Sequence, residues 1–445
     1  MVEAGRSCNF RSTDTNIRIT KSRGLRCGQV EDALLAELDR RLADADAELA
    51  ATYPGERGVR QPVHTVYVPA DRFDAGTVGE WGQGARDALV RHASSRAELA
   101  EALELPTNLS AEVYGRVLAK LEREPIEDLR IDFEDGYGTR PDEQEDAAAL
   151  SAARAVAELV KTAEVPPYYG LRIKSLEAPS RRRGVRTLDL FVGELAAAGA
   201  LTDGFVITLA KVTSVEQIEA MVIVLAAIEE AHGVPSGSLK FEIQVETPQA
   251  ILAPDGTTPL GRMIRAGAGR VTGLHYGTYD YSASLGVAAA YQSMEHPVAD
   301  HAKDVMQLAA AGTGVFVCDG STNVLPVGDR EVVHAAWRLH LRLVRRSLAR
   351  GIYQGWDMHP AQLPSRYVAT YLFYREGLES AAARLRAYLG GGDSGYLDEP
   401  ATAAALASYI LRGLECGATE LSEINTLIGI GTPQLAKLAR RPLRP

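Results

Sequence analysis

The sequence predicts an α/β protein built on a (β/α)8 barrel, the TIM-barrel architecture, with a helical extension before the barrel and a helical segment after it. Three observations predict this fold. Eight short segments rich in branched and aromatic residues recur between residues 61 and 370. Most of them are followed by a segment with helical periodicity, and this alternation is typical of a parallel sheet that closes into a barrel. No Gly-x-Gly-x-x-Gly motif follows the first strand, which argues against a dinucleotide-binding fold.

The N-terminal extension is expected over residues 1–60. Residues 1–29 have no clear periodicity and are rich in Arg, Ser, Thr and Asn, so we expect a mobile and partly disordered stretch there. Apolar residues at positions 33–35, 38 and 42 then predict an amphipathic helix from about Val30 to Ala51.

The barrel is expected over residues 61–370. Its eight predicted strands are Thr65–Val68, Leu129–Phe133, Tyr168–Ile173, Gly204–Leu209, Leu239–Val245, Arg270–His275, Gly314–Cys318 and Gly355–Met358. Residues 71–125, between the first two strands, are expected to be mostly helix and loop. The helices predicted after the later strands cover 142–163, 187–198, 214–232, 258–266, 297–311 and 329–350.

After about Ser365 the chain is predicted to be helical, and residues 371–445 are expected to form a C-terminal helical segment. The run Gly390-Gly391-Gly392 predicts a hinge or turn within that segment. The basic run Arg181–Arg183 is expected in a solvated loop after the third strand, with phosphate binding as the alternative.

The composition is ordinary for a soluble globular protein, and a reducing cytoplasm is the expected location. A formal net charge of −10 argues against a nucleic acid or an anionic membrane as the main partner. No apolar run is long enough to span a bilayer, and the N-terminus lacks the apolar core of a secretory signal. The four cysteines are widely spaced, which argues against structural zinc and a disulfide framework; they are Cys8, Cys27, Cys318 and Cys416.

Two acids follow predicted strands and are candidates for a metal site. Glu246 comes directly after the fifth strand, and Asp280 comes a few residues after the sixth. Active sites of such barrels lie at the carboxyl ends of the strands, so both side chains are expected at one mouth. Two carboxylates together with substrate oxygens suffice for Mg²⁺. The alternative is an ion-paired acid and a helix N-cap.

Glu134, Asp135 and Arg172 are expected at the same mouth. The acidic pair follows the second strand and could hold metal-bound water or orient an arginine; the alternative is a turn before a helix. Arg172 lies in an apolar strand, where a guanidinium needs a partner, either a substrate carboxylate or one of these two acids. Lys174 and Lys211 also follow strands, but each could face solvent.

Three further residues are weaker candidates for chemistry. His275 ends the sixth strand and is the best-placed histidine for proton transfer, although a buried core histidine is the commoner case. Asp319 follows the seventh strand and is a candidate acid or base. His359 precedes Pro360 and is expected to shape the tip of the eighth strand.

Several of these segments resemble one known family in their order and spacing. They are Asp132–Asp135, Leu171–Ile173, Phe241–Pro248, Gly277–Gly286 and Gly355–Gln362. Together they resemble the citrate lyase β-subunit and HpcH/HpaI aldolase family, a phosphoenolpyruvate/pyruvate-type barrel group, and the first is also similar to malate synthases. The resemblance runs from about residue 63 to 370.

The resemblance implies a site and a reaction. Glu246 and Asp280 would hold Mg²⁺ or Mn²⁺, Arg172 would bind a carboxylate or enolate oxygen, and Glu134 with Asp135 would order the waters around the metal. Substrate contacts would come from Gly277, Thr278 and His359. A homo-oligomer, either a trimer or a hexamer, is also implied.

The predicted function is metal-dependent carbon–carbon lyase or aldolase chemistry on a 2-oxo or hydroxy carboxylic acid. His275, Asp319 or a metal-bound water would be the base. One alternative is a CoA-thioester lyase, or a synthase with thioester hydrolysis, of the malyl-CoA or citramalyl-CoA type. In that case Arg181–Arg183 and the loop at His359–Gln362 would approach CoA. A second alternative is a non-catalytic barrel subunit of a complex.

Overall fold

The computed structural model describes residues 32–390, 395 and 398–439. It divides into a first unit that ends at Ala51 and a second that begins at Thr52. Within the first unit the structure describes one helix, α1 (Asp32–Thr52), which agrees with the predicted amphipathic helix. The extension predicted over residues 1–29, with Cys8 and Cys27, lies outside the described residues, as do Gly391 and Gly392 of the predicted glycine hinge.

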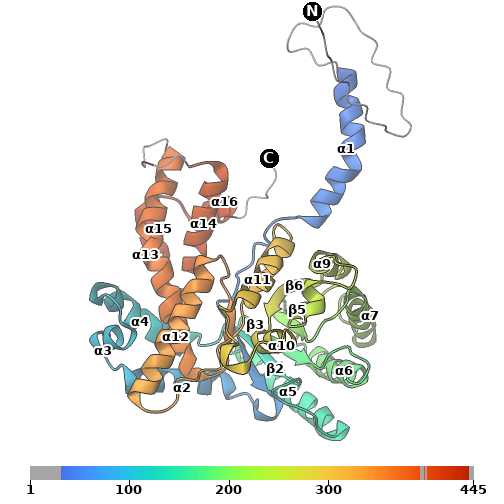
Figure 1. Cartoon of the computed structure of the whole chain (residues 1–445), viewed down its shortest axis with the longest axis horizontal. Coiled ribbons are helices and arrows are strands. Elements are labelled where there is room, and N and C mark those ends of the chain that lie inside the picture. Colours follow the sequence, from blue (N-terminus) through green and yellow to red (C-terminus); the bar gives the residue numbers. More distant parts are fainter. Residues whose placement is uncertain (1–31, 391–394, 396–397, 440–445) are drawn as a thin grey trace, which may run out of the picture. The chain divides into compact units, whose positions relative to one another are not determined.

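The second unit contains the predicted (β/α)8 barrel, which is confirmed (Figure 1). Its strands are β1 (His64–Pro69), β2 (Asp128–Asp132), β3 (Tyr168–Ile173), β4 (Phe205–Leu209), β5 (Lys240–Val245), β6 (Val271–Tyr276), β7 (Phe316–Cys318) and β8 (Gly355–Asp357). All the ladders between them are parallel, and their order in the sheet is β7-β6-β5-β4-β3-β2-β1-β8. Strands that are consecutive in the chain are neighbours from β1 to β7, and β8 lies beside β1.

The barrel closes between β7 and β8 through a few backbone contacts. Cys318 and Gln354 form an isolated parallel bridge, where the other neighbouring strands form ladders. The N–H of Asp319 donates to the carbonyl of Gln354 at 2.8 Å, and the N–H of Trp356 donates to the carbonyl of Gly320 at 3.1 Å. We call this junction the β7–β8 seam.

Side chains alternate along the strands between the helices outside and the barrel interior. In β2, Leu129 and Ile131 belong to the main hydrophobic core, whereas Arg130 is buried and bonds across the interior to Glu242 of β5. The interior of this barrel is therefore polar, and the apolar core lies between the strands and the helices around them.

Each strand is followed by helical structure. The helices between β1 and β8 are α2 (Thr77–His92), α3 (Arg96–Leu103), α4 (Thr107–Arg123), α5 (Asp142–Thr162), α6 (Arg181–Ala197), α7 (Val215–His232), α8 (Pro248–Ile251), α9 (Leu260–Ala266), α10 (Thr278–Ser284), α11 (Pro297–Ala310) and α12 (Arg330–Ala349). Short 3-10 turns lie at Ala70–Arg72, Ala289–Tyr291 and Pro360–Gln362. None of the described helices is long and apolar enough to cross a membrane.

One local prediction was wrong, and one helix was not predicted. The run Arg181–Arg183 was expected in a loop, but it forms the first turn of α6, where Arg183 pairs with Asp146 on α5. The segment after β6 contains α10, which the sequence patterns did not reveal.

After β8 the chain forms α13 (Leu363–Gly390), α14 (Pro400–Glu415), α15 (Leu421–Ile428) and α16 (Thr432–Ala439), which gather into one bundle (Figure 1). The first ten residues of α13 are buried on all sides, since this half packs against α4 and α12. Its second half forms a second hydrophobic core with α14–α16. The half-buried Tyr409 packs against both cores.

Candidate functional site

The carboxyl ends of β2–β6 bring acidic and basic side chains together at one mouth of the barrel. The group comprises Asp132, Glu134, Asp135, Arg172, Lys211, Gln244, Glu246 and Asp280. We call it the mouth cluster. Its five carboxylates exceed its two cationic groups by three, so the mouth carries a strong negative charge when all of them are ionised.

Lys211 lies at the centre of the mouth cluster. Its ammonium Nζ is 2.5 Å from Glu134 Oε1, 2.7 Å from Asp135 Oδ2 and 3.4 Å from Asp280 Oδ2. Burial alone would lower the pKa of Lys211, but the carboxylates of Glu246 and Glu134 outweigh it and raise that pKa. Lys211 is therefore a fixed positive charge between strand ends, and not the solvent-facing lysine that the sequence allowed.

The backbone at Lys211 is also unusual. Its φ of +51° lies in the left-handed region, which a residue with a side chain adopts at some cost. The same backbone turn directs the N–H of Lys211 to Glu246 Oε1 at 2.7 Å. One residue thus contacts Glu246 through its backbone and Asp280 through its side chain.

Arg172 is held rigidly at the end of β3. Its Nε and Nη2 donate to the two carboxylate oxygens of Asp132 at 2.7 and 2.6 Å. The remaining nitrogen, Nη1, has longer contacts, 3.3 Å to Gln244 Oε1 and 3.5 Å to Glu134 Oε2. One edge of the guanidinium is therefore fixed, and the other is loosely occupied and suited to an incoming oxyanion.

Asp132 is fixed in turn by the loop that follows β2. Its carboxylate oxygens accept from the N–H groups of Glu134 and Gly136 at 2.9 and 2.8 Å. Gly136 lies so close that a Cβ there would be 2.5 Å from Asp132 Oδ2. The sequence suggested Glu134 or Asp135 as the structural partner of Arg172, but the main partner is Asp132.

Aromatic rings surround the guanidinium of Arg172. The rings of Tyr67 and Trp356 have their centroids 4.9 and 5.9 Å from Arg172 Cζ. Within the described part of the chain, the buried Tyr67 hydroxyl and the buried Trp356 indole N–H have no hydrogen-bond partner. Buried donors without a partner are costly, and a bound ligand or water would satisfy them.

Glu246 is buried at the end of β5, and its carboxyl group favours the protonated form. Burial is the main cause, with the nearby charges of Glu134 and Asp280 adding to it, and together they raise the pKa of Glu246 to about 8 despite Lys211 and Arg172. Gly277 packs directly on this side chain, since a Cβ at Gly277 would be 2.8 Å from Glu246 Oε2. A cation close to Glu246 would stabilise its ionised form.

The mouth cluster fits a hard divalent cation by its chemistry. Every acidic donor offers oxygen, which is the ligand type that Mg²⁺ and Mn²⁺ prefer. Over residues 32–390, 395 and 398–439, no group of three or more His, Cys, Asp and Glu side chains is arranged to hold a metal. The predicted pair, Glu246 and Asp280, would therefore need substrate oxygens or water to complete a coordination shell.

His275 lies away from the mouth cluster. It is 1% exposed, and its Nε2 is 2.9 Å from Glu242 Oε2, deeper in the barrel interior. Arg130 Nη2 also donates to Glu242, at 2.9 Å. We therefore remove His275 from the candidate site, because it belongs to a buried ionic network below the mouth.

Asp319 also points away from the mouth. Its carboxylate accepts from Lys303 Nζ at 3.0 Å and from the hydroxyl of Ser347 at 2.5 Å, on helices α11 and α12. It is fully buried between the barrel wall and these helices. The candidate role of Asp319 as acid or base is therefore dropped in favour of a structural role.

Thr278 and His359 have local structural contacts. The hydroxyl of Thr278 accepts from the N–H of Ser321 at 3.2 Å, which ties the start of α10 to the loop after β7. His359 Nδ1 accepts from the N–H of Ala361 at 3.1 Å and caps a 3-10 turn, as expected for a residue that shapes the tip of β8. Gly277 remains in the candidate site through its contact with Glu246.

The structure adds Asp132, Lys211 and Gln244 to the candidate site. Gln244 Nε2 donates to Glu246 Oε2 at 2.5 Å while its Oε1 accepts from Arg172, so it links the two predicted halves of the site. All three lie at or just past strand ends, which is the sequence signal that could have found them. Lys174 is also paired, with Glu145 Oε2 at 2.7 Å.

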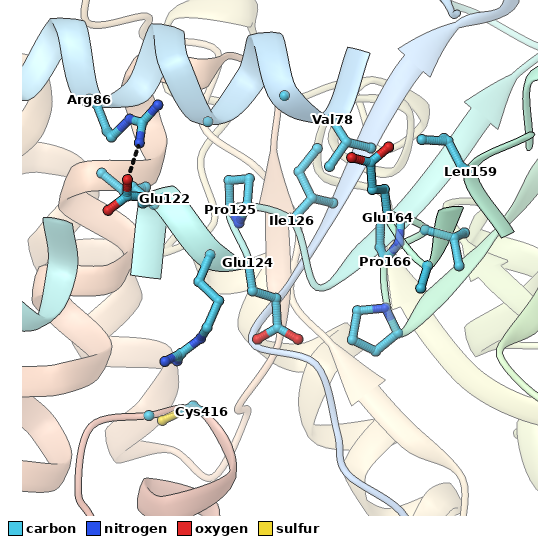
Figure 2. A pocket seen from close by; sticks show the side chains of 18 of the residues that line it. Val78, Arg86, Glu122, Glu124, Pro125, Ile126, Leu159, Glu164, Pro166 and Cys416 are labelled. Atoms are coloured by element: carbon cyan, nitrogen blue, oxygen red, sulfur yellow. Dashed lines mark ion pairs between the residues drawn. The ribbon is translucent and has the colours of Figure 1, made fainter. Parts of the chain in front are cut away.

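A cavity of about 890 Å³ lies at the opposite end of the barrel. It is lined by segments that precede β2 and β3, including Pro125, Ile126 and Pro166. Figure 2 shows Arg86 of α2 reaching Glu122 of α4 on one side of it, a pair 3.5 Å apart. None of the predicted site residues lines this cavity.

Residues 42–443 match the family described as "Domain of unknown function (DUF6986)". No curated protein matches the chain.

Several solved structures are similar to the chain at low identity. The malate synthase of Haloferax volcanii in its magnesium and glyoxylate complex is 14% identical, with 85% of this chain and 98% of that chain covered and a TM-score of 0.48. The citrate lyase β-subunit of M. tuberculosis with oxaloacetate and magnesium is 17% identical, with 70% of this chain and 98% of that chain covered and a TM-score of 0.42. An HpcH/HpaI aldolase/citrate lyase family protein of Burkholderia cenocepacia is 15% identical, with 73% of this chain and 93% of that chain covered and a TM-score of 0.36.

The printed names of these proteins are those of the families that the sequence motifs resemble. Likenesses this distant carry no information on the reaction of this chain. That question depends on its own side chains.

Proposed function

The chain belongs to the family described as a domain of unknown function, DUF6986, and we propose that it is a metal-dependent carbon–carbon lyase. The proposed substrate is a 2-oxo or hydroxy carboxylic acid, and the proposed metal is Mg²⁺ or Mn²⁺. A single observation carries this proposal: a clamped guanidinium and a group of carboxylates with excess negative charge share one barrel mouth.

The charge of the mouth cluster supports a metal. A carboxylate substrate would be repelled by a mouth with excess negative charge, so an anion needs an added cation before it can bind there. Glu246 and Asp280 are the proposed ligands. When bound, the metal would polarise the substrate oxygens and stabilise negative charge that develops during bond cleavage.

Arg172 is the proposed contact for the substrate oxyanion. Asp132 fixes the Nε and Nη2 edge, so Nη1 can donate to a substrate oxygen without a search for its orientation. Donors that are already oriented towards developing charge lower the barrier more than mobile ones. Asp132 is in this proposal a positioning residue for Arg172.

Glu134 is the mouth carboxylate best suited to accept the hydroxyl proton. Burial raises the pKa of Glu134, whereas in Asp135 the ammonium of Lys211 outweighs burial and lowers the pKa. A base whose pKa is raised towards neutrality accepts a proton more readily. Glu134 would take the hydroxyl proton as the carbon–carbon bond breaks to a carbonyl product and an enolate, and would then return that proton to the enolate carbon. Lys211 would hold the two carboxylates in place and remain charged throughout.

The test is turnover of the purified chain with Mg²⁺ or Mn²⁺ against a panel of 2-oxo acids with aldehydes, hydroxy acids and hydroxyacyl-CoA esters. We expect retro-aldol cleavage of a free acid that requires metal. Glu246→Gln and Asp280→Asn should abolish it and should weaken Mn²⁺ binding measured by electron paramagnetic resonance. Glu219→Gln, an exposed carboxylate on α7, is the matched control and should behave as the parent chain.

Three outcomes would count against the proposal in different ways. Turnover of CoA esters alone would favour the CoA-thioester alternative. Metal binding without turnover of any member of the panel would favour a non-catalytic barrel. Normal turnover in both metal-site variants would exclude Glu246 and Asp280 as ligands.

The arginine run gives the CoA-thioester alternative little support. Arg183 is taken up by Asp146 at 2.5 Å, and Arg181 Nε donates to the carbonyl of Leu176 at 2.9 Å. Two of the three arginines that were candidates for binding a CoA phosphate therefore already contact other residues of this chain.

A further inference from the structure

Helix α1 carries a narrow stripe of apolar residues at regular spacing. Leu35, Leu38, Leu42, Ala45 and Leu49 follow one another at intervals of three, four, three and four residues. The leucines of this stripe are 43–53% exposed, with Leu38 the least and Leu49 the most exposed. The stripe runs along almost the whole of Asp32–Thr52.

The spacing favours another helix as the partner of this stripe. An alternation of three and four residues has a period of about 3.5, which is that of a two-helix coiled coil, whereas a helix on a globular core shows a wider stripe. Helices in proteins gain most of their stability from packing an apolar face against a partner, so a partner would stabilise α1. Leu35, Leu42 and Leu49 then take the a positions, and Leu38 and Ala45 take the d positions.

The charges beside the stripe specify the direction of the partner. The three e positions are Asp32, Asp39 and Asp46, and the three g positions are Leu34, Arg41 and Glu48, so Arg41 is the one cation among them. In an antiparallel pair of identical helices, e positions face e positions, so aspartates would face aspartates. In a parallel pair, each g residue faces the e residue five positions further along the partner, which places Arg41 opposite Asp46.

We infer that α1 pairs in parallel with α1 of a second copy of this chain. The pair buries the leucine stripe of both helices and forms the contact between Arg41 and Asp46 twice by symmetry. Arg41 is available for it as a half-exposed side chain, although it now contacts Glu37 of its own helix at 2.6 Å. This inference concerns assembly and does not depend on the proposed reaction.

The first experiment measures the mass of the full-length chain in solution by light scattering after size-exclusion chromatography. We expect the parent chain to have at least twice the 47.8 kDa of a single chain and Leu35→Asp/Leu42→Asp to have half the mass of the parent. Ala36→Asp/Ala43→Asp adds the same charges to the same helix outside the stripe and should keep the parent mass. A monomeric parent chain, an unchanged mass in the leucine variant, or an equal loss in both variants would overturn the inference.

The second experiment tests the direction of the pair by sedimentation equilibrium. Asp46→Arg places two arginines opposite each other in a parallel pair, so we expect the dissociation constant to rise about tenfold. Adding Arg41→Asp to Asp46→Arg should restore the parent value. In an antiparallel pair Asp46→Arg would instead relieve repulsion among aspartates, and tighter association of this variant would overturn the parallel arrangement.

Discussion

Lys211 offsets part of the negative charge of the mouth cluster. Its ammonium contacts Glu134, Asp135 and Asp280 and lies beside Glu246, so it offsets charge that a metal would otherwise meet. The proposed cation must bind next to this ammonium and compete with it for the same oxygens. Lys211 should therefore weaken metal binding while keeping the acidic loops together.

Replacing Lys211 by Met tests this competition. We expect Lys211→Met to bind Mn²⁺ about tenfold more tightly, equivalent to about 1.4 kcal/mol, because one positive charge has gone from the cluster. Calorimetric titration with Mn²⁺ measures this, with Lys240→Met at the other end of the barrel as the control. Weaker binding in Lys211→Met would mean that the lysine organises the ligands and does not compete with the metal.

Replacing Arg172 by Lys tests the orientation of the substrate contact. A lysine keeps the charge but loses the two-point contact with Asp132, so kcat/KM should fall about 100-fold. Arg154→Lys is the control, since Arg154 forms an exposed pair with Glu194. Unchanged kcat/KM in Arg172→Lys would show that charge alone is enough at this position.

Glu229 links stability to pH at a site far from the mouth cluster. Its carboxylate accepts from both terminal nitrogens of Arg270 at 2.6 and 2.7 Å and from the N–H groups of Gly237 and Leu239. Burial opposes ionisation, but these donors outweigh it and lower the pKa of Glu229 from 4.5 to about 2. A lowered pKa in the folded state adds stability above the unfolded pKa, and this stability is lost as the pH falls.

We expect Glu229→Gln to lower the free energy of unfolding by about 3 kcal/mol at neutral pH. The difference from the parent should shrink as the pH falls from 4.5 to about 2, because the parent then loses the same charge. Urea unfolding at several pH values measures both effects, and Glu230→Gln on the exposed side of α7 is the control. A difference that does not change with pH would contradict the assigned pKa.

At the scale of single residues, the sequence could identify acids and bases but not their partners. Five charged residues were predicted at one mouth because each lies near or just after the end of a strand: Glu134, Asp135, Arg172, Glu246 and Asp280. Which nitrogen contacts which oxygen depends on where each side chain points. Successive residues of a strand point to opposite faces, so a shift of one residue moves a side chain from one face to the other.

His275 and Asp319 show the consequence of that dependence. Both lie at strand ends, as an active-site residue should. His275 folds down to Glu242 in the interior, and Asp319 points outward to Lys303. Position at a strand end therefore does not decide whether a side chain points into the mouth.

At the scale of elements, β3 and β4 need a glycine where they pair. Gly170 lies opposite Val206, and a Cβ at Gly170 would be 1.8 Å from the carbonyl oxygen of Val206. Such an overlap involves backbone on both strands and cannot be relieved by a side-chain rotation.

Gly170→Ala should therefore destabilise the fold by about 3 kcal/mol. Because Arg172 is two residues further along β3, the variant should also lose activity. Gly115→Ala is the control: it lies on the exposed side of α4 with no atom within 4 Å of a new Cβ, and it should gain about 0.5–1 kcal/mol. Thermal unfolding compares the two, and equal stability would rule out the predicted overlap.

The elements were predictable where periodicity is strong. All eight strands and most of the helices after them appear close to the expected residues. The start of α6 was missed because a run of three arginines is typical of a solvated loop. In the structure, acids on α5, including Asp146, offset the charge of arginines in this part of α6. Contacts between distant elements leave no trace in a local pattern.

At the scale of the whole molecule, α13 joins two hydrophobic cores. Its first half belongs to the barrel core and its second half to the core of α14–α16. Since one continuous helix serves both, the barrel and the C-terminal bundle should unfold in one cooperative transition.

Leu385→Ala tests this cooperativity. Leu385 is fully buried in the second core, so the substitution should cost about 3 kcal/mol and shift the whole transition to lower temperature. Leu389→Ala, on the same helix but 39% exposed, should have little effect. Differential scanning calorimetry measures this, and a separate early transition in Leu385→Ala would show that the bundle unfolds independently.

The β7–β8 seam gives the barrel one weak joint. Amide protons at Asp319 and Trp356 should exchange with solvent sooner than those along the continuous ladders, because few neighbouring bonds protect them. Opening there would turn the closed cylinder into a curved sheet with two free edges. Arg172, Lys211 and Glu246 would stay assembled in that sheet, because β3, β4 and β5 lie in its unbroken middle. These three side chains of the mouth cluster would therefore keep their arrangement while the barrel opens locally at the β7–β8 seam.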